Sequence, residues 1–175
     1  GGGGRSRGGG WGGAGEGVED RGRGGGPGAL GRRVDRTDPA PIPAAFADIG
    51  QRWGAVNSLV NTVGPGDGYF EEMSDADWDA AFQLGLMAAV RCTNATLPLL
   101  RTSAWGPIAN VAAHSIQRHN PSIDAYTAYK AAVAIVSNDV AKSLAMGAVL
   151  VTTLSSRTYV TVRFTDAVQA TGETD

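Results

Sequence analysis

Short apolar runs alternate with longer amphipathic segments from about residue 37 onward, and this alternation limits the fold more than any other feature of the sequence. The apolar runs have the length of strands and cover residues 55–61, 107–112 and 148–154. Segments with helical spacing cover residues 38–54, 75–100, 124–146 and 163–170. Strands that alternate with helices predict right-handed crossovers and a parallel sheet covered by helices on both faces. The predicted fold class is therefore α/β.

Residues suited to helix ends mark two of these segments. Ser74 favours a helix N-terminus, and Asp75 and Asp77 follow it where the positive end of the helix dipole stabilises a carboxylate. Gly147 favours the end of the helix predicted over residues 124–146. One long helix over residues 75–100 and a second over 124–146 are therefore expected.

The first 31 residues differ sharply in composition from the rest. They hold 17 of the 26 glycines and very few aliphatic side chains, so they have little to bury against the entropy of ordering. We predict a disordered segment over residues 1–31 and one domain over residues 32–175. Runs of arginine and glycine at residues 5–10 and 21–26 leave open an RNA-binding tail, although this segment lacks Phe and Tyr and contains three acidic residues.

Charge and composition exclude several classes of function. A net charge of -2 gives no electrostatic reason to expect a nucleic-acid partner for the whole chain. Cys92 is the single cysteine, so no intrachain disulfide forms, and no apolar run approaches the length of a membrane span or a leader sequence. A cytoplasmic location is the expectation. His114 and His119 have no further cysteine or histidine near them, so no metal site is predicted.

Tyr126 and Lys130 form the one pair that suggests a reaction. They are four residues apart in a predicted helix and therefore share a face. A neighbouring ammonium group favours phenolate, which allows a tyrosine to give and take a proton near neutral pH. A surface helix can show the same spacing without any function. The chain has only two lysines and four tyrosines, however, so the spacing is seldom expected by chance.

Five blocks resemble, in order, the motifs of the short-chain dehydrogenase/reductase family. They are Asp35-Arg36-Thr37-Asp38, Leu59-Val60-Asn61-Thr62-Val63-Gly64, Trp78 to Leu86, Asn110-Val111-Ala112-Ala113 followed by Tyr126-Thr127-Ala128-Tyr129-Lys130, and Val151 to Thr161. The match covers about residues 35–165. Any one block is a weak signal, whereas the ordered set is a strong one.

The resemblance implies a Rossmann-like sheet and an oxidoreductase that uses NAD or NADP. Hydride would pass between the nicotinamide and a small alcohol or carbonyl substrate, with Tyr126 as general acid or base and Lys130 beside it. The residues that the resemblance assigns to cofactor binding are Asp35, Asn61, Gly64, Tyr126, Lys130, Tyr159 and Thr161. It also implies a homo-oligomer formed through helices 75–100 and 124–146.

The sequence departs from the family pattern at the functional positions. Ala113 stands where a catalytic serine is expected; Ser115 is a candidate replacement, and an ordinary loop serine is the equal alternative. Gly85 stands where an active-site asparagine is expected. Residues 12–17 are rich in glycine but follow no strand, so no first βαβ unit for the pyrophosphate is recognisable. The predicted sheet is therefore partial, whether the chain is an active enzyme stays open, and the alternative is a non-catalytic remnant that acts as an oligomerising or interaction module.

Overall fold

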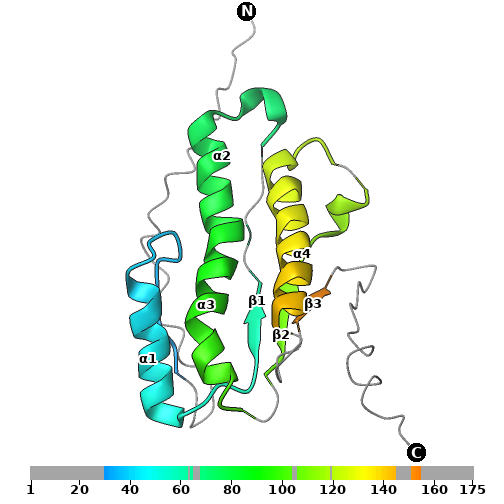
Figure 1. The fold of residues 1–175 in the computed structure, drawn as a ribbon. Helices are drawn as coiled ribbons and strands as arrows, with labels where there is room; N and C mark the ends of the chain where they lie inside the picture. The colour runs from blue at the N-terminus through cyan, green and yellow to red at the C-terminus, as the bar shows by residue number, and fades with distance from the viewer. Residues whose placement is uncertain are drawn as a thin grey trace, which may run out of the picture. The chain divides into compact units, whose positions relative to one another are not determined.

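Three parallel strands, the helices that join them and a helix that precedes the first strand form the described part of the chain (Figure 1). The computed structural model describes residues 30–62, 64, 68–103, 106–118, 120–144 and 151–154. The elements are α1 (Pro41–Trp53), β1 (Leu59–Asn61), η2 (Phe70–Glu72), α2 (Asp75–Phe82), η3 (Gln83–Met87), α3 (Ala88–Leu100), β2 (Ile108–Val111), η4 (His114–Ile116), α4 (Asp124–Leu144) and β3 (Val151–Leu154). Residues 1–29 of the segment predicted to be disordered and the helix predicted over residues 163–170 lie outside the described residues.

The sheet has the strand order β1-β2-β3, and both pairings are parallel. Leu59 pairs with Ile108 in the first ladder, and Ile108 pairs with Val151 in the second. Each predicted apolar run supplies one strand, although each strand is shorter than its run. A parallel sheet flanked by helices confirms the predicted α/β class.

The helices next to the sheet lie on one of its faces. Ile108 is fully buried on β2 between Leu100 of α3 and Ala141 of α4. On β1, the side chain of Val60 points to the other face and is 57% exposed. The predicted helices on both faces are thus not found among the described residues. The chain crosses from β1 to β2 and then from β2 to β3, which is the same direction along the sheet. Because both crossover connections are right-handed, α3 and α4 lie on the same side of the sheet.

Helix α1 packs on α3 rather than on the strands. Its first turn begins with Pro41, whose fixed φ suits that position, and it ends at Gly54, which has a left-handed φ of 75°. Gly50 lies against Leu99 of α3, where a Cβ on Gly50 would be 2.9 Å from a terminal methyl group. The end predicted near Gly54 is confirmed.

A wide helical turn interrupts the long helix predicted over residues 75–100. Ser74 begins it with a reciprocal cap, because its hydroxyl accepts from the backbone of Asp77 and the Asp77 carboxylate accepts from the backbone of Ser74. The π-helical turn η3 then spans Gln83–Met87, with the backbone N–H of Ala88 donating to the carbonyl of Gln83. The predicted single α-helix is therefore wrong at η3. Turns of this kind often mark functional sites.

The last described helix, α4, starts at the predicted residue and extends to Leu144. Gly147, its predicted stop, lies outside the described residues. Among the helices of the described ranges, none combines the length and the hydropathy needed to cross a membrane.

Candidate active site

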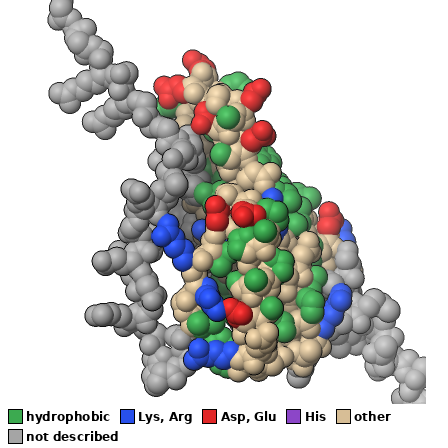
Figure 2. Space-filling view, turned by 90° about the vertical axis from the view of Figure 1, so that its left-hand side faces the viewer, with side chains coloured by type: hydrophobic (Ala, Val, Ile, Leu, Met, Phe, Trp, Pro, Cys, Tyr) green, Lys and Arg blue, Asp and Glu red, His purple; other side chains and the backbone are tan. Residues whose placement is uncertain are grey.

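The first turn of α4 is attached to the segment that follows β1. The backbone N–H of Gly68 donates to the carbonyl of Ser122 at 2.8 Å, and that of Phe70 donates to the Asp124 carboxylate at 3.2 Å. Phe70 is 69% exposed and packs edge-on against Trp78, with ring centroids 6.0 Å apart. Acidic side chains gather at this end of the molecule (Figure 2). The segment that contains Gly68 and Phe70, with acidic side chains near it, is thus attached to α4 within one helical turn of Tyr126.

Lys130 places its ammonium group at the carboxyl end of the central strand. Its side chain is 4% exposed, and Nζ donates to the carbonyl oxygen of Val111, the last residue of β2, at 2.5 Å. The same nitrogen lies 5.7 Å from the centre of the half-buried Tyr126 ring. Burial lowers the pKa of Lys130, because desolvation disfavours the charged form. The structure therefore brings the predicted pair together at one edge of the sheet.

Gly64 brings the backbone after β1 against the same two side chains. A Cβ at Gly64 would lie 3.1 Å from Cε of Lys130 and 3.1 Å from a ring carbon of Tyr126. The backbone angle φ of Gly64 is 154°, a value that residues other than glycine rarely adopt. The loop, the phenol and the ammonium thus meet beyond the carboxyl ends of β1 and β2, where open α/β sheets bind ligands.

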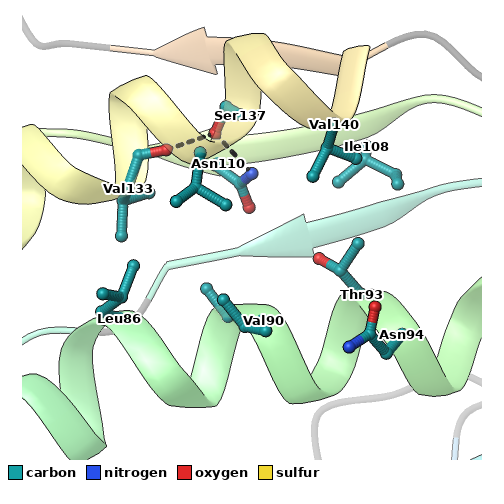
Figure 3. A pocket seen from close by; sticks show the side chains of 11 residues that line it. Leu86, Val90, Thr93, Asn94, Ile108, Asn110, Val133, Ser137 and Val140 are labelled. Atoms are coloured by element: carbon teal, nitrogen blue, oxygen red, sulfur yellow. Dashed lines mark hydrogen bonds between the residues drawn. The ribbon is translucent and has the colours of Figure 1, made fainter. Parts of the chain in front are cut away.

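Asn61 takes part in a buried chain of hydrogen bonds across the fold. Its amide donates to the side-chain oxygen of Asn110 at 2.8 Å and to the hydroxyl of Thr93 at 3.4 Å. The amide of Asn110 donates to Ser137 at 2.8 Å, and Ser137 donates to the carbonyl of Val133 at 2.6 Å (Figure 3). This chain joins α3, β1, β2 and α4. A contact between Asn61 and a cofactor remains a prediction.

Ser115 lies in η4, next to the helix that carries Tyr126. It is 8% exposed, and its hydroxyl accepts a hydrogen bond of 2.8 Å from Thr127. Ala113, where the family serine is expected, is buried just after β2. The neighbouring His114 has a buried Nδ1 with no hydrogen-bond partner among the described residues. Ser115 is thus bonded to Thr127, the residue that follows Tyr126 in α4.

Asp35 lies in an exposed turn before α1. Its carboxylate accepts from the backbone and the hydroxyl of Thr37, at 2.8 and 2.7 Å, and these hydrogen bonds lower the pKa of Asp35. Arg91 of α3 donates to the carbonyls of Arg36 and Thr37, each at 3.1 Å, which holds this turn against the helix. The predicted contact of Asp35 with adenine stays a prediction.

Two predicted cofactor residues, Tyr159 and Thr161, lie outside the described residues. In the ranges that are described, no three histidine, cysteine or acidic side chains lie close enough to hold a metal. The sequence interpretation missed one residue of this region, Tyr129, which is fully buried and edge-on to Tyr126 at 5.4 Å. Its position three residues after Tyr126 in a predicted helix could have placed it on the same face as Tyr126, but the residues it packs against come from distant segments.

A separate pocket lies between α3 and α4 over β2 (Figure 3). Its lining residues are Leu86, Ala89, Val90, Thr93, Asn94, Ile108, Asn110, Val133, Val136, Ser137 and Val140. Neither Tyr126 nor Lys130 belongs to this set, so the pocket is distinct from the Tyr126 site. It lies between the two helical segments predicted to form an oligomer interface.

Comparisons with known proteins agree with this arrangement. A short-chain type dehydrogenase/reductase of Picea abies is 27% identical over 115 residues, which is 64% of this chain and 42% of that protein. Nodulation protein G of Rhizobium sp. (strain N33) is 37% identical over 92 residues, 51% of this chain and 37% of that protein. The crystal structure of a short-chain dehydrogenase from Streptomyces avermitilis matches with a TM-score of 0.67 and 30% identity, covering 76% of this chain and 49% of that one.

This chain thus spans less than half the length of each of these three proteins. A family model described as short chain dehydrogenase matches residues 16–171, which is most of the sequence. The three strands, the helices between them and the Tyr126–Lys130 pair all lie inside that match. The chain therefore belongs to the short-chain dehydrogenase family.

Proposed function

We propose that this chain is part of an oxidoreductase that moves hydride between NAD or NADP and a small alcohol or carbonyl compound. One observation carries the proposal: Tyr126 and Lys130 meet Gly64 beyond the carboxyl ends of β1 and β2. Family membership supports the same class of reaction.

The residues present fit a nicotinamide nucleotide at this edge of the sheet. Gly64 lets the backbone approach without a Cβ, and Lys130 and Tyr126 bring an ammonium and a hydroxyl to the same place. Such groups suit the hydroxyls of a ribose. Gly64, Tyr126 and Lys130 would therefore hold the nicotinamide half of the cofactor, which supplies or accepts the hydride when bound.

Tyr126 would handle the proton in this reaction. During reduction its hydroxyl gives a proton to the substrate oxygen, and during oxidation its phenolate takes one back. The carbonyl of Val111 accepts a hydrogen bond from the Lys130 ammonium and so fixes the direction in which it points. Water must be kept from this pair, which the burial of Lys130 supports.

Ser115 is proposed to bind the substrate oxygen in place of the missing serine at position 113. The bond from Thr127 uses an acceptor site of its hydroxyl and leaves its proton for another partner. Asp35, Asn61, Tyr159 and Thr161 are proposed to contact other parts of the cofactor, as the resemblance implies.

A homo-oligomer through residues 75–100 and 124–146 is also proposed. Ile135 of α4 is 62% exposed, and apolar side chains of α3 and α4 line the pocket between the two helices. Apolar surface of this kind supports association with a second copy. Light scattering after size exclusion would test this, with Ile135→Glu expected to lower the measured mass.

Equilibrium titration of the purified chain with NADH and with NADPH tests the proposed function. We expect saturable binding of at least one of them in the micromolar range, and a loss of about tenfold or more in Lys130→Ala. Lys142→Ala is the matched control, because Lys142 is an exposed lysine of the same helix. No saturable binding of either nucleotide below about a millimolar would instead favour a non-catalytic remnant.

A further inference from the structure

Tyr129 is a second tyrosine in the site, and its side chain is fully buried. It lies on α4 between Tyr126 and Lys130. Its ring is edge-on to Tyr126, with centroids 5.4 Å apart and an angle of 78° between the planes. Nζ of Lys130 lies 5.9 Å from the centre of the same ring. Tyr129 therefore packs against Tyr126 and lies beside the ammonium group of Lys130.

The ring of Tyr129 occupies the space in which a side chain at Gly85 would lie. A Cβ at Gly85 would be 2.3 Å from two of its ring carbons and 2.6 Å from a third. Gly85 is buried within the π-helical turn η3, and Phe82 lies edge-on to the ring at 6.4 Å. A rigid ring cannot yield as the end of a flexible side chain can, so only glycine fits here.

The hydroxyl end of Tyr129 reaches the loop after β1. A Cβ at Gly64 would be 2.3 Å from this hydroxyl oxygen. One side chain thus spans from Gly85 in η3 to Gly64, and it does so beside Tyr126 and Lys130. Because a phenol ring is long and rigid, the Tyr129 side chain can hold the backbone at Gly85 and the backbone at Gly64 at a defined separation.

We propose that Tyr129 is a positioning residue: seated against Gly85 and Gly64, it holds Tyr126 and Lys130 in register with the loop after β1. This inference rests on the proposed function, because positioning Tyr126 and Lys130 has a catalytic effect only if these residues act on a bound nicotinamide cofactor and substrate. Gly85 serves as the notch that receives the ring, so residues 85 and 129 constrain each other.

The chemistry of Tyr129 agrees with a positioning role. Burial, and in second place the neighbouring Tyr126, raise the pKa of Tyr129 above its ordinary value. Its phenol therefore stays protonated at neutral pH and does not compete with Tyr126 as a base.

Substitution of Gly85 by alanine tests the notch. Gly85 has no positive φ, and alanine normally stabilises a helix interior relative to glycine. We expect the opposite here: Gly85→Ala lowers the melting temperature by about 4 °C or more, because its methyl group meets the ring. In the Tyr129→Ser background the same change should raise the melting temperature. Gly50→Ala is the matched control, since its methyl group meets only the flexible end of the Leu99 side chain, and it should not destabilise the protein.

Two further measurements separate positioning from simple packing. In chains labelled with ¹³Cζ-tyrosine, Tyr129→Ser and Gly85→Ala should each move the Tyr126 resonance, whereas Tyr129→Phe, which keeps the ring, should leave it nearly in place. Tyr129→Ser should weaken NADH binding about tenfold, and Tyr129→Phe by no more than about twofold. If Tyr129→Ser does not fold, Tyr129→Leu keeps an apolar group in its place.

The inference is overturned if Gly85→Ala stabilises the wild-type chain as it would an ordinary helix. It is also overturned if removal of the ring leaves the Tyr126 resonance unchanged. The resonance and the melting temperatures are read without a cofactor, so they test Tyr129 even if NADH does not bind. Absence of NADH binding to the wild-type chain would count against the proposed function alone.

Discussion

The ammonium nitrogen of Lys130 donates a hydrogen bond to the carbonyl oxygen of Val111, the last residue of β2. This bond joins the middle of α4 to the carboxyl end of the central strand. Because Tyr126 lies one turn earlier on the same helix, the bond also sets where the phenol lies relative to the sheet.

Tyr126→Phe removes the hydroxyl that handles the proton. We expect kcat/KM for carbonyl reduction to fall about 100-fold or more, because a positioned general acid contributes at least that much. Nucleotide binding should weaken much less than kcat/KM falls, since Gly64 and Lys130 remain. Steady-state kinetics over a panel of small ketones and aldehydes would measure this. Tyr69→Phe alters an exposed tyrosine and should keep full activity; equal activity in the Tyr126 variant would contradict the assigned role.

Lys130 should make stability rise with pH over a defined window. Its pKa is lowered in the folded chain, so between that value and the ordinary 10.5 the unfolded chain binds more protons. The free energy of unfolding then increases with pH, by at most about 1.4 kcal/mol per pH unit. Lys130→Met should lose this increase, whereas Lys142→Met should keep it. Urea unfolding at several pH values would show the difference, and parallel profiles for wild type and Lys130→Met would refute it.

Tyr129 should have the opposite effect in alkaline solution. Its pKa is raised in the folded chain by burial, so above pH 10.0 the unfolded chain loses this proton first. The stability that Tyr129 contributes is therefore complete below pH 10.0 and is lost as pH rises further. Tyr129→Phe should reduce this alkaline loss, and Tyr69→Phe should not. The comparison requires unfolding curves on both sides of pH 10.0, and a loss of the same size in Tyr129→Phe would argue against it.

Asn61→Ala should destabilise the fold through Asn110. The change removes the donor to the Asn110 side-chain oxygen and leaves that buried acceptor without its bond of 2.8 Å. An unsatisfied buried acceptor costs about 1–3 kcal/mol. Asn94→Ala, at an exposed position of α3, is the control and should cost little. Chemical denaturation measures both, and equal stabilities would mean that the buried amide chain contributes nothing.

Much of the fold was predictable from local patterns. The alternation of apolar runs with helical segments predicted a parallel α/β sheet, and the structure confirms it. Ser74 predicted a helix N-terminus and forms a capping box there. Both features depend on residues close together in the chain, so the sequence contains the whole cause. That α3 and α4 cover the same face of the sheet depends instead on the order of the strands, and no local sequence pattern predicts that order.

The spacing of Tyr126 and Lys130 is enough to place them on one face of one helix, so this part of the site could be predicted without a structure. The groups that surround this pair depend on how distant segments pack together. The Val111 carbonyl, the backbone of Gly64 and the notch at Gly85 come from three other segments, and nothing in the helix specifies which of these it packs against. Packing among segments distant in sequence seats Tyr129 in that notch, because a rigid ring needs a space that a distant glycine leaves open.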